Sequence, residues 1–222
     1  MSFIYEEALR ASSELAVERG VFPNWDKSVY AQRGIRLRNG TLTSLAPTGT
    51  ISIIAGTTSG IEPLYALAYK RKNVLSGETL YEANPLFLEW CLRLGFTPQE
   101  FHERLIPSLS RTGCISDTEG LPGDLKRLFA TALEIPFEQH IRIQAAFQKY
   151  VDNSVSKTVN MPDSAGVADV EKAYRDAYRL GCKGITVFRY GSRKQQVLEL
   201  GSDESALEKE YFIKCDPGAC RL

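Results

Sequence analysis

Residues 46–53, Ala-Pro-Thr-Gly-Thr-Ile-Ser-Ile, place three hydroxyl side chains and a glycine between two apolar runs. Backbone N–H groups in a turn that opens a helix form a positively polarised hollow suited to phosphate, and glycine allows a ligand to approach closely. The hydroxyls of Thr48, Thr50 and Ser52 could donate to the same anion. A helix N-cap is the alternative, because Ser and Thr are favoured there and the Gly-x-x-x-x-Gly-Lys spacing of a P-loop is absent.

A second candidate for chemistry is the pair Cys215 and Cys220 in the terminal stretch "KCDPGAC". The Pro-Gly between them favours a turn, so the pair can close a small disulfide ring and reopen it by thiolate exchange. A metal clip is the alternative. Structural zinc normally needs four ligands, and no nearby His or further Cys completes the set, so we predict no metal site.

The remaining cysteines and histidines are interpreted as structural. Cys91 lies in the apolar run "LFLEWCLRL" and Cys182 follows a glycine before an expected strand, so both are expected to pack in the interior. Cys114 is interpreted in the same way, against the alternative of an active-site thiol. His102 and His140 have no acidic or cysteine companion at ligand spacing, so neither is assigned to a metal or to acid–base chemistry.

Two further kinds of side chain leave open questions. Lys157 lies near the end of an expected strand, where it could face a phosphate or could equally be a solvated surface lysine. We therefore do not include it among the site residues. Tyr178 and Phe188 are expected to be core aromatics.

Composition excludes several classes of function. The chain has 222 residues, with 27 Lys and Arg against 27 Asp and Glu, so no global field draws it to nucleic acid or a membrane surface. No apolar run reaches the ~20 residues of a transmembrane helix, and the first residues resemble no signal peptide. Five cysteines without an export signal argue against a disulfide framework. We expect a soluble, cytoplasmic protein.

Local signals position several elements before the central stretch. Ile4, Ala8, Ala11 and Leu15 have helical spacing and Gly20 follows, which predicts a first helix. A short strand is expected at 41–46, so that the hydroxyl-rich turn follows the carboxyl end of a strand, where α/β sheets gather ligands. Short helical pieces are expected around 51–69. Asn84-Pro85 and Gly95 bracket another predicted helix.

The carboxyl-terminal half predicts a strand–helix–strand unit. Helices are expected at 124–133 and 136–151, followed by a β-branched strand at 154–160, a helix that ends at Gly181, and a strand at 184–190. Such a crossover implies parallel strands in an α/β sheet. From residue 201 the sequence becomes polar and predicts a mobile tail.

Three blocks carry a resemblance to a known family: "LAPTGTISIIAGTTSGIEPLYALAY", "HIRIQAAFQKYVDNSVSKTVNMP" and "GCKGITVFRYGSR". In this order they resemble the carboxyl-terminal part of the large subunit of adenosylcobalamin-dependent (class II) ribonucleotide reductases. The similarity runs from the first helix to about Arg193. It implies the second half of a ten-stranded α/β barrel over residues 1–200, with parallel strands and crossover helices, followed by a flexible redox-active tail over 201–222.

The resemblance also implies functions for particular residues. Thr48, Gly49, Thr50, Ile51 and Ser52 match the stretch that binds the substrate diphosphate in this family. The tail pair, in the last eight residues, matches the cysteines that re-reduce the active site and are themselves reduced by thioredoxin or glutaredoxin. Adenosylcobalamin is the implied cofactor, shared with a partner chain. The aromatic pattern "VFRY", which lacks a tyrosine pair for a radical relay, favours this cobalamin class.

The family's Asn-x-Cys-x-Glu motif and its radical-forming finger-loop cysteine are absent from this sequence. The resemblance therefore implies an amino-terminal reductase polypeptide that carries the radical cysteine, in a split enzyme that reduces ribonucleotides. Met1 directly before a helix favours a separate gene product over an excised fragment. A non-catalytic regulatory or degenerate half-subunit that binds a reductase or a nucleotide is the alternative. An independent phosphate-binding enzyme would need a nucleophile or an acid–base pair, which we do not find.

Overall fold

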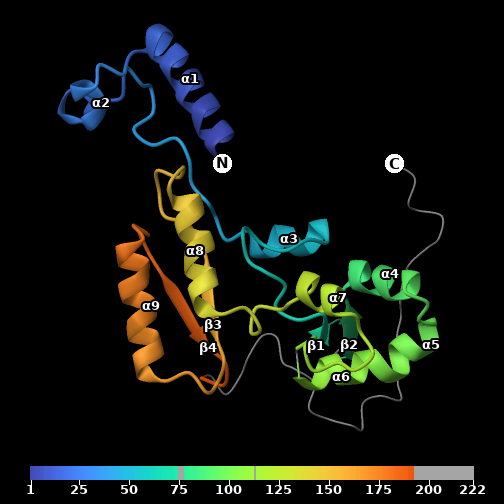
Figure 1. Cartoon of the computed structure of the whole chain (residues 1–222). Helices are drawn as coiled ribbons and strands as arrows, with labels where there is room; N and C mark the ends of the chain where they lie inside the picture. Colours follow the sequence, from blue (N-terminus) through green and yellow to red (C-terminus); the bar gives the residue numbers. More distant parts are fainter. Residues whose placement is uncertain (75–77, 113, 193–222) are drawn as a thin grey trace. The chain divides into compact units, whose positions relative to one another are not determined.

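The structure is a computed structural model that describes residues 1–74, 78–112 and 114–192. The chain divides into two compact units, one formed by Met1–Pro63 with Ile135–Ser192 and the other containing Leu64–Glu134. Among the described residues no helix is long and apolar enough to cross a membrane. Figure 1 labels the helices and strands of both units.

The first unit begins with the predicted amino-terminal helix, α1 (Ser2–Arg19), which ends at Gly20 with a φ of 77°. Its buried side differs from the predicted one, because Ser12 and Ala16 are buried whereas Ile4 is exposed. The Ser12 hydroxyl donates to Asn39 Oδ1 at 3.0 Å and accepts from the Asn39 amide at 3.0 Å. These bonds turn the serine face of α1 toward the following segment. The short elements η1 (Trp25–Lys27), α2 (Val29–Gln32) and α3 (Gly49–Ala55) follow.

The expected strand–helix–strand unit is present in the first unit. Strand β3 (Thr158–Met161) pairs in parallel with β4 (Thr186–Arg189), with Thr158 opposite Thr186, and α9 (Val167–Arg179) connects them. The α8 helix (Phe137–Gln148) precedes β3 (Figure 1). The expected strand at 41–46 is reduced to a parallel bridge between Leu45 and Val155.

Helices α8 and α9 pack on one face of the β3–β4 pair. Their shared core consists of Ile141 from α8, Val159 and Met161 from β3, and Ala173 and Ala177 from α9. Because side chains alternate along a strand, Thr158 and Asn160 of β3 and Thr186 and Phe188 of β4 belong to the opposite face. The sheet therefore has an apolar face toward the helices and a more polar face opposite.

The second unit contains an antiparallel strand pair and a group of helices. Strands β1 (Ala68–Val74) and β2 (Glu78–Ala83) were not predicted from the sequence. Helix α4 (Pro85–Arg93) was predicted, and Asn84 Oδ1 caps it by accepting the Phe87 amide at 3.0 Å. The helical elements after it are α5 (Pro98–Glu100), the π-helical η2 (Phe101–Leu105), α6 (Ile106–Thr112) and α7 (Gly123–Leu128). The last of these is shorter than the helix expected at 124–133.

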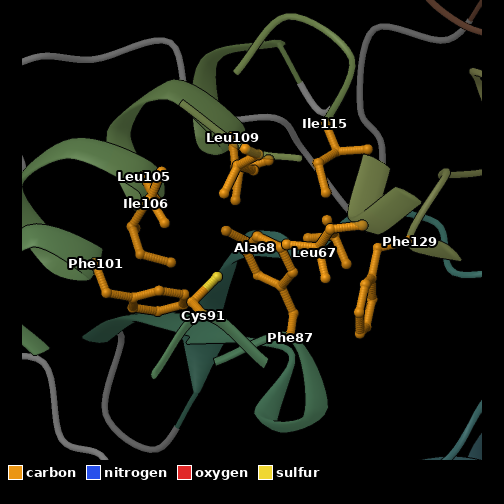
Figure 2. Close-up of a cluster of buried hydrophobic side chains, with 12 residues drawn as sticks. Leu67, Ala68, Phe87, Cys91, Phe101, Leu105, Ile106, Leu109, Ile115 and Phe129 are labelled. Carbon is orange, nitrogen blue, oxygen red and sulfur yellow. The ribbon is translucent and has the colours of Figure 1, made fainter. Parts of the chain in front are cut away.

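One apolar cluster holds the second unit together (Figure 2). Phe87 lies at its centre, fully buried, with its ring 5.8 Å from that of Phe101 and 5.3 Å from that of Phe129. Cys91 belongs to the same cluster, as predicted. Aromatic pairs at these separations add to the free energy of burial.

Truncation of Phe87 should therefore destabilise this unit. We expect Phe87→Ala to lower the free energy of unfolding by about 3–5 kcal/mol, because it removes a ring from a closed core. The neighbouring Leu86, on the same helix, is 61% exposed and provides a matched control. Urea unfolding followed by circular dichroism would measure both variants, and equal midpoints for Phe87→Ala and Leu86→Ala would contradict the core described above.

Candidate functional site

The hydroxyl-rich turn lies between the Leu45 bridge and helix α3. Thr48 directly precedes α3 and has a φ of 52°, in the left-handed region. Such a backbone conformation is unusual for a β-branched residue and costs of the order of 1–3 kcal/mol. It persists only where the surrounding structure holds it in place. An N-cap residue normally has extended backbone angles, so the geometry of Thr48 does not match a simple helix N-cap.

A returning loop fixes Thr48 in this conformation. The Gly60 amide donates to the Thr48 hydroxyl oxygen at 2.8 Å, a bond to the loop and not to the helix that follows Thr48. Gly60 itself has a φ of 52°, and a Cβ there would lie 3.2 Å from the carbonyl oxygen of Ala46. Only glycine fits this close approach without strain.

The first turn of α3 leaves donors available. The amides of Gly49, Thr50 and Ile51 have no intrahelical acceptor, because the first N–H groups of a helix lack one. Thr50 and Ile51 are exposed, and a Cβ added at Gly49 would meet nothing within 4 Å. Ser52 differs. It is buried, its amide donates to Thr48 O at 3.0 Å and its hydroxyl donates to Gly49 O at 2.7 Å, so its donors serve the turn itself.

Behind this loop lies a buried charge network that the sequence analysis missed. Lys157, interpreted as equally suited to a phosphate or to the surface, is 3% exposed. Its ammonium donates to Glu62 Oε2 at 2.6 Å, to His140 Nδ1 at 2.8 Å and to Thr158 O at 2.5 Å. All three N–H donors of the ammonium are thus used. Donation to Nδ1 requires a neutral His140 with its proton on Nε2.

The network compensates for burial. Desolvation lowers the pKa of Lys157, and the hydrogen bond and charge of Glu62 oppose that shift. The second oxygen of Glu62, Oε1, accepts the Thr158 amide at 2.5 Å. Two residues earlier, the Ser156 amide donates to the backbone oxygen of Leu45. The Glu62 carboxylate therefore accepts the next amide along this edge of the strand, as a backbone carbonyl of a neighbouring strand would do.

A sequence signal for the buried lysine did exist. Val155, Lys157, Val159 and Met161 alternate along the strand, and all four are buried. Period-two alternation places Lys157 on the apolar face, where a lysine must be paired. Glu62 carried no comparable signal, because it is 95 residues away along the chain.

The cysteines of the described part are not in disulfides and lie in packed surroundings. Cys91 is buried, while Cys114 and Cys182 are half-buried. Burial raises the pKa of both Cys91 and Cys114 to about 11, and for Cys114 the carboxylates of Glu134 and Asp117 add to the shift. Such thiols are poor nucleophiles near neutral pH, as expected for packing residues. Cys215 and Cys220 lie outside the described residues.

His140 is buried, whereas Tyr178 is exposed. His140 is 2% exposed and belongs to the lysine network, in keeping with a structural role. The described ranges contain no group of three or more His, Cys, Asp or Glu that could hold a metal ion. Tyr178 is not a core residue, since it is 85% exposed on α9, where Ala173 and Ala177 form the buried side.

Comparison with known proteins gives consistent matches. The family model for the ribonucleotide reductase barrel domain matches residues 1–188. The vitamin B12-dependent ribonucleoside-diphosphate reductase of Thermoplasma acidophilum is 47% identical over 213 residues, 96% of this chain and 27% of that protein. The protein of the same name from Mycobacterium tuberculosis H37Rv is 44% identical over 225 residues, 100% of this chain and 31% of that protein.

A solved structure extends the comparison to the fold. The alpha subunit of the class Id ribonucleotide reductase of Actinobacillus ureae superposes with a TM-score of 0.68 at 26% identity, covering 86% of this chain and 33% of that one. With the family model, this match indicates an α/β barrel fold. The chain spans a third or less of the length of these relatives.

The buried network yields a stability prediction. Lys157→Met should lower the free energy of unfolding by about 3 kcal/mol, because it leaves the Glu62 carboxylate without its charge partner. Lys172→Met is the matched control, since Lys172 bonds Glu138 and Asp176 on the surface of α8 and α9. Urea unfolding would compare them. A midpoint for Lys157→Met as close to wild type as that of the control would refute a stabilising network.

Proposed function

This chain belongs to the ribonucleotide reductase barrel-domain family, and we propose that it is the carboxyl-terminal component of an adenosylcobalamin-dependent ribonucleotide reductase. With an amino-terminal reductase polypeptide that carries the radical cysteine, it reduces ribonucleotides to deoxyribonucleotides. Its own contributions are the substrate-phosphate turn, part of the barrel and the reducing tail. We place this work in the cytoplasm, in DNA precursor synthesis.

The observation that carries the proposal is the conformation of Thr48. A β-branched residue with a φ of 52°, held by the Gly60 amide, stands where a parallel strand segment passes into a helix. Strained residues of this kind cluster at ligand clamps, and ligands of α/β folds gather beyond the carboxyl ends of strands. The turn therefore fits a binding role better than a purely structural one.

The donors of the turn suit a diphosphate. The amides of Gly49, Thr50 and Ile51 point from the first turn of α3, so the apolar side chain of Ile51 does not prevent its participation. The Thr48 and Thr50 hydroxyls can donate in addition, because the Thr48 oxygen accepts from Gly60 while its hydrogen stays available. Ser52 contributes by closing the turn through Gly49 and Thr48.

The barrel is completed by the partner. We assign residues 1–200 to the second half of a ten-stranded barrel and 201–222 to the redox-active tail. The parallel β3–β4 pair and the Leu45–Val155 bridge supply three neighbouring parallel segments that support this assignment. Because a barrel leaves no strand edge unpaired, a half-barrel needs a permanent partner that supplies the other strands.

Adenosylcobalamin is the cofactor that we assign to the assembled enzyme, since the relatives above are named as vitamin B12-dependent. When bound, its cobalt–carbon bond supplies the radical. The groove between α8 and α9 has a volume of about 300 Å³, too small for a corrinoid, and His140 is occupied by Lys157. No step through the cofactor is therefore assigned to this chain.

The tail would return electrons to the active site. The thiolate of one tail cysteine, Cys215 or Cys220, attacks the active-site disulfide formed in turnover and gives a mixed disulfide with release of one thiol. The other tail cysteine then attacks the mixed disulfide, so the second active-site thiol is released and the tail pair is oxidised. Thioredoxin or glutaredoxin supplies the two electrons that reduce the tail.

Substitution of Gly49 tests the phosphate turn without disturbing the fold. We expect Gly49→Val to raise the KM for a ribonucleoside diphosphate about tenfold, because a side chain would enter the space of the phosphate, while the thermal midpoint stays unchanged. Gly123→Val is the matched control, since Gly123 also begins a helix and also has nothing within 4 Å of an added Cβ. Equal KM values for the two variants would exclude Gly49 from the site.

Reconstitution tests the whole proposal. We expect cobalamin-dependent reduction of CDP only when this chain and its amino-terminal partner are mixed, because neither holds all the reacting groups. The double variant Cys215→Ser/Cys220→Ser should lose thioredoxin-driven turnover and keep turnover driven by dithiothreitol. Cys114→Ser should keep both. A stable but inactive complex would favour the alternative, a regulatory or degenerate half-subunit that binds a reductase or a nucleotide.

A further inference from the structure

Resting on the phosphate role proposed above, we propose that Lys157 is a positioning residue for the substrate diphosphate. It acts through Glu62 and Gly60 on Thr48, and so sets the shape of the phosphate turn from behind the sheet. This function goes beyond the proposed site, which contains neither Lys157 nor Glu62.

The Glu62 carboxylate is held in place by two hydrogen-bond partners. Both of its carboxylate oxygens are used, Oε2 by the Lys157 ammonium and Oε1 by the Thr158 amide. The ammonium is in turn fixed by His140 and by the Thr158 carbonyl, with its side chain 1% exposed. Charge-assisted bonds in such buried surroundings are short and directional. Glu62 therefore has one position relative to β3 and α8.

The second step carries this position to Gly60. The Glu62 amide donates to Ser59 O at 2.9 Å and closes a four-residue turn that contains Gly60. Because Gly60 is two residues from the fixed carboxylate and inside a closed turn, its amide direction follows from where Glu62 is fixed. Its close approach to the Ala46 carbonyl limits movement on the other side.

The third step reaches the phosphate turn. The Gly60 amide is the donor that holds the Thr48 hydroxyl oxygen at 2.8 Å. A strained backbone such as that of Thr48 persists only where its surroundings over-determine it. Loss of the Lys157 charge would free Glu62, release the Gly60 turn and allow Thr48 to relax, which would misplace the α3 amides.

Lys157 cannot act on the phosphate directly. Its three N–H donors go to Glu62, His140 and Thr158, and its side chain lies on the helix-facing side of β3 with Val159 and Met161. If Lys157 were purely structural, its replacement would lower the stability of the fold. The phosphate affinity of the protein that remains folded would not change. The two roles therefore differ in coupling, which a double-mutant cycle measures.

The test uses Lys157→Met, Thr48→Val and the double variant, each mixed with the amino-terminal partner, with Lys172→Met as control. We expect each single variant to raise the KM for CDP about tenfold, the scale of one lost hydrogen bond to a charged group, with kcat within about twofold. The double variant should match Thr48→Val, because Thr48→Val already breaks the contacts through which Lys157 acts and also removes the Thr48 hydroxyl donor. An unchanged KM in Lys157→Met, or a multiplied loss of about a hundredfold in the double variant, would overturn the proposal.

A second measurement does not depend on turnover. Hydrogen exchange of the Gly60 amide in the complex with the amino-terminal partner should be slow in the wild type and in Lys172→Met, and about tenfold faster in Lys157→Met. Should Lys157→Met not fold, Glu62→Gln tests the same link, because it removes the carboxylate charge while the residue keeps its size. An inactive wild-type mixture would refute the reductase role. Unchanged Gly60 exchange in a folded variant would refute the positioning role independently.

Discussion

The need to neutralise one buried ammonium group organises the first unit. Transfer of a charged lysine from water into an apolar interior is costly unless a counter-charge and acceptors for all three N–H groups are present. For Lys157 these come from a loop, a helix and its own strand: Glu62, His140 and Thr158. One side chain therefore brings together a loop and a helix that lie 95 and 17 residues before it in the sequence.

The same pairing explains how a short, polar loop can hold a strained residue in place. Residues 56–62 have little apolar surface to bury, so hydrophobic packing alone would not order them. Their order comes from the carboxylate at their end, which joins the edge of β3 as though it were a strand carbonyl. Thr48 thereby relies on the hydrogen bond from the Gly60 amide, and the ion pair between Glu62 and Lys157 holds that amide in position.

Local signals allowed part of this structure to be predicted. Asn84-Pro85 and Gly95 defined α4, and alternating β-branched residues with a helix between them defined the parallel β3–β4 pair. The segment that became β1, "AYKRKNV", lacks the apolar alternation by which a strand is found, so the antiparallel pair was missed. The partnership of Lys157 with Glu62 was beyond reach, because one sequence does not indicate which distant charges meet. Tyr178 was misassigned because hydrophobic character alone does not say which side of a helix is covered.

The hydrogen bond from the Ala132 amide to the Leu64 carbonyl, 2.7 Å long, joins the two ends of the second unit. The chain leaves the first unit after Pro63 and returns to it at Ile135. Residues 64–134 are therefore an insertion in the first unit, and the two ends of the insertion are hydrogen-bonded to each other. An insertion of this form can change in length and composition without moving the strands of the first unit. The reason is that contacts within the insertion offset the entropy lost in bringing its ends together. Evolutionary exchange of this segment would leave the Glu62–Lys157 contact, which spans it, in place.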